Sequence, residues 1–380
     1  MEEREDKSKG QKQMNINRRV YTAAAVLTAA CMAAATASAQ NFMVYQYGAS
    51  AGAVSQVSVA NLKPNWVATG VRNGAGEVEL IAWKSNGHAL LRKGSATCPT
   101  VVENASVATV ALTPNLVMTG AIYLSTLQVT PWSVSATGAV TCGAYGLLFT
   151  AASSVRMTKL DSERLVAATD GNGQLNLSMW AMIDGQIDNI TGAPVLGSDG
   201  TIPAVAAVSP SWLVTAIRNG AGDLQLDSWF VTEGNAILHQ ATATAGGVSE
   251  LDITAWDSGH VATPVRNSAG DLELIDWTLN TTTGAIVRES SITVGGISQV
   301  AASTIGSLVF SASLNSSGNV DAGVWGYDGT QIEAGASAPQ EAGTAVAAAP
   351  LSTGLYSVTA TRTAAGNLQV DVWSGDYVAP

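Results

Sequence analysis

A tryptophan returns at an almost constant interval along most of this 380-residue chain, and this spacing restricts the folds that the chain can adopt. The intervals between successive copies are 49, 48, 49, 48, 48 and 48 residues. A repeat of this length is one supersecondary unit that cannot bury its apolar face alone, so neighbouring units must stack on one another. The recurring tryptophans are Trp83, Trp132, Trp180, Trp229, Trp277, Trp325 and Trp373.

A repeated motif ends at several of these tryptophans. RNGAGDLQLDSW covers residues 218–229, and near copies are RNGAGEVELIAW at 72–83, RNSAGDLELIDW at 266–277 and RTAAGNLQVDVW at 362–373. After the second glycine, apolar and polar residues alternate as in a strand with one buried face. We therefore expect a β-hairpin whose loop places Gly76, Gly222 and Gly270 at positive φ.

Each unit contains four short runs with strand character. Examples are AVSQVSV (53–59) for the first, WLVTAIR (212–218) for the second, DLQLDSW (223–229) for the third and NAILHQA (235–241) for the fourth. Gly, Asn and Ser separate the runs, and no helical periodicity competes with them after residue 40. The sequence predicts an all-β fold with four antiparallel strands in each of seven units.

The two ends of the chain complement each other. Seven residues follow Trp373, so the last unit lacks a fourth run. The segment FMVYQYGASAGAVSQV (42–57) aligns without a gap to AIVRESSITVGGISQV (285–300), which is a fourth run followed by the start of the next unit. We expect this N-terminal strand to complete the last unit and to close the units into a ring without exposed sheet edges.

With four strands in each of seven units, the chain resembles seven-bladed β-propellers over residues 41–380. It lacks the signatures of three subfamilies. No motif tryptophan is followed by the aspartate of WD40 repeats, a double glycine has no fixed place as in kelch repeats, and glycine precedes the acid instead of following it as in Asp-boxes. The resemblance therefore implies the architecture and carries no catalytic residues.

The first 39 residues have the features of a secretory signal. Arg18 and Arg19 precede the apolar run VYTAAAVLTAACMAAA, and a small-residue site predicts cleavage after Ala39. Met14 is an alternative start. The apolar run is too short to span a membrane, so we expect export to the periplasm or the cell exterior. Residues 40–380 are expected to form a single domain, acting as a monomer.

The exported part is strongly acidic. The chain has 18 basic and 29 acidic residues, of which the first forty residues hold six and four. The remainder thus has 12 basic and 25 acidic residues and a formal net charge of −13. This charge repels phosphate groups, so neither nucleic acid nor anionic lipid is an expected partner.

Charged residues flank the hairpin loops: in four units an arginine lies just before the loop, and in three of these an acid lies just after it. In units that lack the arginine the acid is also absent, as at Thr169 with Gln174 and at Leu314 with Asn319. This co-occurrence favours a cross-strand ion pair. A ligand site is the alternative, because fucose-type propeller lectins combine arginine, an acid and tryptophan in a pocket. Here only a pocket between blades could reunite them, because acid and tryptophan lie about 20 Å apart on one strand. The arginines are Arg72, Arg218, Arg266 and Arg362, and the facing residues are Glu77, Asp223, Asp271 and Asn367.

The tryptophans have two interpretations each. The seven recurring ones are expected to be structural anchors between blades, although aromatic platforms for sugar stacking are the alternative. Trp66, Trp212 and Trp256 occur in only some units, in the connections from first to second strand. They are candidate ligand contacts, with a capping role as the alternative.

Metal and catalytic groupings are not evident. His88, His239 and His260 fall at unrelated places, so neither a zinc cluster nor a Ser-His-Asp grouping is visible, and no cofactor is expected. DGNGQ (170–174) weakly resembles a calcium loop but lacks its final glutamate, so a tight turn is expected. An oxidising compartment permits a disulfide between Cys98 and Cys142, although sequence alone cannot show that they meet.

The leading hypothesis is an exported, non-enzymatic binding propeller whose partner is a glycan or an envelope or extracellular protein. One alternative is a glycan hydrolase or lyase with its site at the central channel. Enzymic propellers usually carry long atypical loops, and the tryptophan spacing varies here by a single residue. Another alternative is a structural or adhesion module without a small ligand.

Overall fold

The chain folds almost entirely into β-strands. The computed structural model describes residues 42–101, 106–191, 195–327, 332–334, 338–351 and 356–376, all within the unit Asn41–Asp376. The all-β prediction is confirmed for these residues. The predicted signal at residues 1–39, with its alternative start at Met14, lies outside the described residues. Within the described ranges no helix is long and apolar enough to cross a bilayer.

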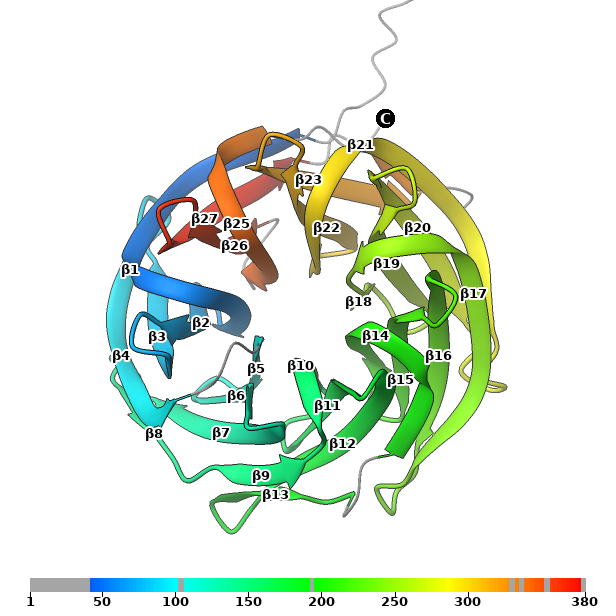
Figure 1. Ribbon diagram of the computed structural model, residues 1–380. Helices are drawn as coiled ribbons and strands as arrows, with labels where there is room; N and C mark the ends of the chain where they lie inside the picture. Colours follow the sequence, from blue (N-terminus) through cyan, green and yellow to red (C-terminus); the bar gives the residue numbers. More distant parts are fainter. Residues whose placement is uncertain are drawn as a thin grey trace, which may run out of the picture. The chain divides into compact units, whose positions relative to one another are not determined.

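The strands pair antiparallel in groups that we name sheets A to G, and successive sheets follow the chain (Figure 1). Sheet B contains part of β1 (Phe42–Lys63) with β2 (Trp66–Asn73), β3 (Glu77–Ser85) and β4 (Leu90–Val101). Sheet C contains β5 (Val107–Thr113), β6 (Leu116–Tyr123), β7 (Thr126–Val134), β8 (Val140–Cys142) and β9 (Gly146–Phe149). Sheet D contains β10 (Ala152–Lys159), β11 (Arg164–Gly171), β12 (Gln174–Ile183), β13 (Gln186–Asn189) and the start of β14 (Val195–Ser209).

The other sheets have the same order of strands. Sheet E contains the rest of β14, β15 (Trp212–Asn219), β16 (Asp223–Val231) and the start of β17 (Ile237–Leu251). Sheet F contains the end of β17, β18 (Thr254–Ala255), β19 (His260–Asn267), β20 (Asp271–Leu279) and the start of β21 (Ile286–Ile305). Sheet G contains the end of β21, β22 (Leu308–Asn315), β23 (Asn319–Tyr327), β24 (Ile332–Ala334) and the start of β25 (Ala338–Leu351). Sheet A contains the end of β25, β26 (Tyr356–Thr363), β27 (Asn367–Asp376) and the start of β1.

Long strands connect one sheet to the next. The first part of β21 pairs with β20 as far as Gly296, and its second part, from Ile297, pairs with β22. The same strand is therefore the outer strand of sheet F and the inner strand of sheet G. β1, β14, β17 and β25 make equivalent passages.

The N-terminal strand lies beside the last strand, as Figure 1 shows for β1 and β27. Tyr45 lies opposite Trp373, and Ala53 lies opposite Asn367. The leading segment thus supplies the outer strand of sheet A before it enters sheet B as the inner strand.

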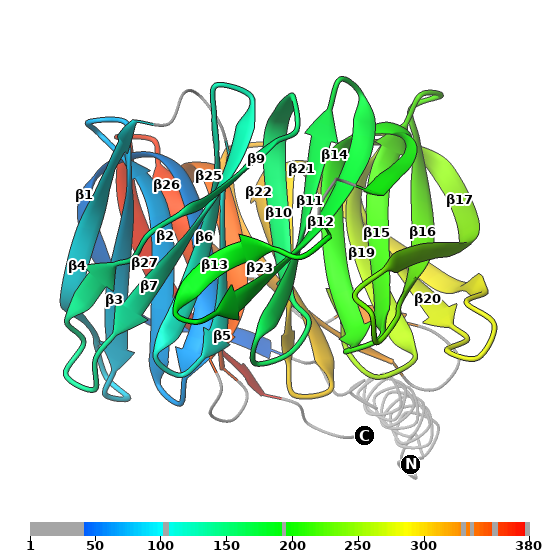
Figure 2. The same cartoon turned by 90° about the horizontal axis from the view of Figure 1, so that it is seen from below.

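The apolar core is divided into layers that lie between neighbouring sheets. Figure 2 shows these sheets side by side. One layer joins Leu224 and Leu226 of sheet E to Trp277 of sheet F. Another joins Phe310 of sheet G to Trp373 of sheet A. In each layer the motif tryptophan packs against the preceding sheet, so the sequence repeat provides one such contact per unit.

Candidate functional site

Asparagine and glycine shape the repeated hairpin loop. The Oδ1 atom of Asn219 accepts hydrogen bonds from the backbone N–H groups of Ala221 and Asp223, both at 3.0 Å. Gly222 has a φ of 89°, a left-handed conformation that is unfavourable for residues with a Cβ atom. Gly76 and Gly270 have φ values of 85° and 89°, so the predicted positive φ is confirmed.

The ion pairs predicted across this loop for Arg218 and Arg266 are wrong. None of the ion pairs between described residues joins Arg218 to Asp223 or Arg266 to Asp271. In the register of their sheets Asp223 and Asp271 lie opposite glycines of the outer strands, and Glu77 lies opposite Val101. The Nε atoms of Arg218 and Arg266 instead donate to backbone carbonyls of the next sheet.

Each of three arginines links its hairpin to the neighbouring sheet. Arg218 of sheet E donates from Nε to the carbonyl of Val248 in sheet F at 2.8 Å, and the Val248 N–H donates to the carbonyl of Gly222 at 2.9 Å. We call this pair of hydrogen bonds the hairpin latch. The other two latches are Arg266 with Ile297 and Gly270, and Arg362 with Val54 and Gly366. Arg72 donates to Ser55 Oγ at 2.9 Å. The latch explains the repeated Arg and Gly without a ligand.

The motif tryptophans are buried in the layers between sheets. Each is at most 3% exposed, which leaves no ring face for a sugar to stack on. Each indole N–H donates to a hydroxyl, as Trp229 does to Thr215 at 2.9 Å. The other acceptors are Thr69, Thr119, Ser178, Thr263, Ser311 and Thr359. These contacts agree with the anchoring interpretation.

The three sporadic tryptophans have different environments. Trp66 and Trp212 are only 6% and 7% exposed, and a glycine of a neighbouring sheet, Gly138 or Gly284, packs on each ring. Lys63 Nζ also lies 4.6 Å from the centre of the Trp66 ring. Trp256 is half-buried and meets His260 edge to face at 5.8 Å. Trp66 and Trp212 therefore fill space between sheets, and a ligand could reach only Trp256.

Two further sequence features have simple structural roles. Cys98 on β4 and Cys142 on β8 form a disulfide, with their Cα atoms 6.0 Å apart, and thereby join sheets B and C. The segment DGNGQ forms a tight hairpin in which Gly171 pairs with Gln174. Asn172 and Gly173 have positive φ, as the expected tight turn requires.

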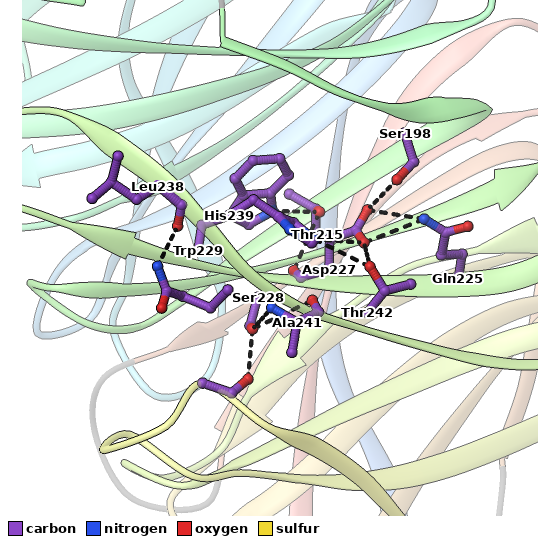
Figure 3. A network of polar contacts seen from close by, with 12 residues as sticks. Ser198, Thr215, Gln225, Asp227, Ser228, Trp229, Leu238, His239, Ala241 and Thr242 are labelled. Atoms are coloured by element: carbon purple, nitrogen blue, oxygen red, sulfur yellow. Dashed lines mark hydrogen bonds and ion pairs between the residues drawn. The ribbon is translucent and has the colours of Figure 1, made fainter.

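A buried aspartate organises a polar network between sheets D and E (Figure 3). The Asp227 side chain is fully buried, and its carboxylate accepts hydrogen bonds from Gln225 at 3.1 Å and Thr242 at 2.5 Å. The hydroxyl of Ser198 in sheet D donates to it at 3.1 Å, and His239 Nε2 lies 3.3 Å away. The serine donates to the carboxyl group and not to the histidine, so these contacts position the Asp227 side chain and do not form the serine–histidine pair of a nucleophilic relay.

A pocket of about 390 Å³ opens between sheets F and G. Its mouth is the exposed turn Ser316–Ser317, and its buried end contains Gly323 and Trp325. The side chains of Ser311, Ser313, Asn315 and Asp321 supply polar groups, while Leu272, Val294 and Ile297 supply an apolar wall.

The absence of a side chain at Gly323 opens the deep end of this pocket. A Cβ atom there would lie 3.3 Å from Ser311 Oγ and 3.4 Å from the Trp325 ring. The residue two positions before the motif tryptophan is Ile81 in sheet B and Ile275 in sheet F, where it fills the equivalent space. Sheet G alone has glycine at this position.

Inner strands of all the sheets line a central cavity of about 290 Å³. Its charged side chains are Arg156 from sheet D, Glu250 from β17 of sheet F, and Asp252, which directly follows β17. Burial raises the pKa values of both carboxyl groups, and attraction to Arg156 opposes this effect. Gln56 and Gln299 supply neutral polar groups.

The two carboxylates of the cavity differ in their hydrogen bonds. Asp252 accepts from the backbone N–H of Ala302 in sheet G at 2.8 Å and from the N–H of Ile253 at 2.9 Å. It is therefore another link between sheets. Glu250 lies on β17 itself, whereas Asp252 directly follows the last residue of that strand, and both line the cavity.

The sequence did not single out these pocket residues, yet a column-by-column comparison of the repeats contains a signal. The position four before each motif tryptophan is always an acid or an amide, and Asp321 is its copy in sheet G. Glu250 occupies the register position that Gln56 and Gln299 have in sheets B and G. The column positions are Glu79, Gln128, Asn176, Gln225, Glu273, Asp321 and Gln369.

Comparison with known proteins shows the fold but no family or function. No protein-family model matches the sequence, and no curated protein matches it. The β-propeller domain of Cps50 (Swd1) from Myceliophteria thermophila is similar with a TM-score of 0.59 and 10% identity, over 88% of this chain and 99% of that one. The periplasmic gluconolactonase PpgL of Pseudomonas aeruginosa has a TM-score of 0.56 and 11% identity, over 76% and 86%. A chain of the COPII outer coat vertex has a TM-score of 0.57 and 14% identity, over 86% and 85%.

Proposed function

Starting from its β-propeller fold, we propose that this protein is an exported binding module that recognises glycans. We further propose that sheets A to G are seven blades closed into a ring. Three observations support the ring: the pairing of β1 with β27, an apolar layer between sheets A and G, and another between sheets A and B. Residues 40–380 would then be one domain.

Export is the part of the proposal that rests on the sequence. The N-terminal segment has the order of charged, apolar and small residues that a secretory signal needs. The disulfide between Cys98 and Cys142 fits an oxidising compartment, the periplasm or the cell exterior.

The pocket between sheets F and G is the single observation that carries glycan recognition. Its volume of about 390 Å³ lies in the range of small-molecule sites. Ser311 Oγ accepts from the Trp325 indole at 2.8 Å and keeps its own O–H to donate. One carboxylate oxygen of Asp321 accepts a hydrogen bond from Asn315 Nδ2 at 3.1 Å, so the other oxygen is available to a sugar hydroxyl. The apolar wall suits the C–H face of a sugar ring.

A binding role is favoured over glycan cleavage in the central cavity. Cleavage by two carboxyl groups requires one to donate a proton and the other to act as base or nucleophile. Asp252 accepts from two backbone N–H groups, that of the adjacent Ile253 and that of Ala302 in sheet G. Only Glu250 of this pair is then free to exchange protons with a substrate.

The mature protein should be retained by at least one glycan on an array or polysaccharide column. Gly323→Ile should abolish this binding by filling the pocket, and the fold should accept isoleucine because Ile81 and Ile275 occupy the equivalent positions. Gly246→Ile is the matched control, since a Cβ atom at Gly246 meets nothing within 4 Å. Equal glycan binding by Gly323→Ile and the unaltered protein would refute this site, and retention on no glycan would refute the function.

A further inference from the structure

We propose that the central cavity is a second binding site, for a small zwitterion that carries one ammonium and one carboxylate group. The site is separate from the pocket between sheets F and G, because no residue lines both. It was not evident from the sequence, since Arg156, Glu250 and Gln299 are far apart in the chain and come from three sheets.

The cavity holds opposite charges that do not neutralise each other. Arg156 interacts electrostatically with Glu250 and Asp252, but no ion pair within 4.0 Å joins it to either among the described residues. The Arg156 side chain is exposed to the cavity, and its NH1 atom donates to the carbonyl of Val155 at 3.1 Å. Charges of opposite sign that face one space without touching can be bridged by a ligand of complementary charge.

Each charged group favours one end of such a ligand. A guanidinium group presents a planar set of donors that matches a carboxylate. Glu250 is half-buried, and burial raises the pKa of its carboxyl group, so a bound ammonium would stabilise its charged form. Gln56 and Gln299 can both donate to and accept from the ligand.

The cavity is large enough for a small ligand. Its volume of about 290 Å³ is close to the lower limit for small-molecule sites, and the inner strands line an adjoining space of about 370 Å³ that shares Val59, Thr109 and Met157 with it. Backbone and side chains from all the sheets line it, and Asp252 is held by sheet G, so the wall is built from linked strands. We therefore expect a free amino acid, an ω-amino acid or a dipeptide as the occupant.

Substitutions that copy other sheets test this site without disturbing the fold. Glu250→Gln introduces the residue that Gln56 and Gln299 provide at the same register position. Arg156→Val introduces the residue that Val57 and Val300 provide at the equivalent position. Glu233→Gln and Lys93→Met are controls, because both residues are exposed and lie outside the cavity.

Titration calorimetry of the full mature protein should be carried out with the common amino acids, γ-aminobutyrate and glycylglycine, and also with putrescine, succinate and calcium. At least one zwitterion should bind, and both cavity variants should weaken its binding by about tenfold or more, while the controls leave it unchanged. The proposal is wrong if no zwitterion binds at millimolar concentration. It is equally wrong if putrescine or calcium binds as tightly as any zwitterion, or if the cavity variants bind like the unaltered protein. Glycan binding by the Gly323 pocket should be the same in all these variants.

Discussion

Replacing Asp276 by asparagine should stabilise the protein near neutral pH and change its stability little near pH 4. The Asp276 side chain has no exposed surface, and the Nδ1 atom of His260 lies 3.6 Å from one of its carboxylate oxygens. Burial raises the pKa of Asp276 from 3.8 to about 6, because attraction to His260 only partly compensates for the lost hydration. The equivalent residues in sheets B, G and A are Ala82, Val324 and Val372.

The sign of the effect follows from this raised pKa. Between about pH 4 and pH 6 the folded protein holds a proton on Asp276 that the unfolded chain has released, so stability falls as pH rises through this window. A pKa difference from 3.8 to about 6 corresponds to at most about 3 kcal/mol at neutral pH. For a domain of this size that free energy corresponds to about 4 °C in Tm.

Scanning calorimetry of the unaltered protein and Asp276→Asn at a series of pH values between about 4 and 8 would measure the effect. The Tm difference between the two proteins should grow in favour of the variant as pH rises through about 6. Asp188→Asn is the control, because Asp188 is exposed on β13 and should show no such trend. A Tm difference that is the same at all pH values would refute the assignment of the pH dependence to Asp276.

Three further predictions concern the links between sheets. Arg218→Met should lower the free energy of unfolding by about 1–3 kcal/mol through loss of the latch to Val248. Arg92→Met, which breaks an exposed ion pair with Glu79 and an exposed hydrogen bond to Ser95, should cost under about 1 kcal/mol in denaturant titrations. Reduction of the disulfide, or the double substitution Cys98→Ser with Cys142→Ser, should lower the free energy of unfolding by up to about 4 kcal/mol, because the bond closes a loop with a sequence separation of 44. An unchanged Tm under reducing conditions would contradict this. Deletion of residues 42–53 should expose the edge of β27 and cause aggregation on size-exclusion chromatography, and a stable monomer would argue against a closed ring.

Much of the fold was predictable because the repeated residues determine local structure, namely strands, turns and buried faces. The alternation after Gly222 sets which face of β16 is buried, and the glycine itself determines the geometry of the loop. The alignment of residues 42–57 with residues 285–300 predicted the partner of the first strand, since both segments carry the same succession of outer and inner strand. These features depend on neighbours in sequence or on strict periodicity, and both can be read without coordinates.

The candidate sites depended on the tertiary structure. The sequence placed Arg218 opposite Asp223, but it could not show that a carbonyl of the next sheet lies within reach, so the ion-pair prediction failed. Likewise the pocket exists because Gly323 leaves a space that only the adjacent sheet F completes. Arg156 and Glu250 meet at one cavity because inner strands from every sheet converge there. Periodicity determines backbone conformation and the buried face, whereas contacts across sheets depend on how far each side chain extends into space that distant segments enclose.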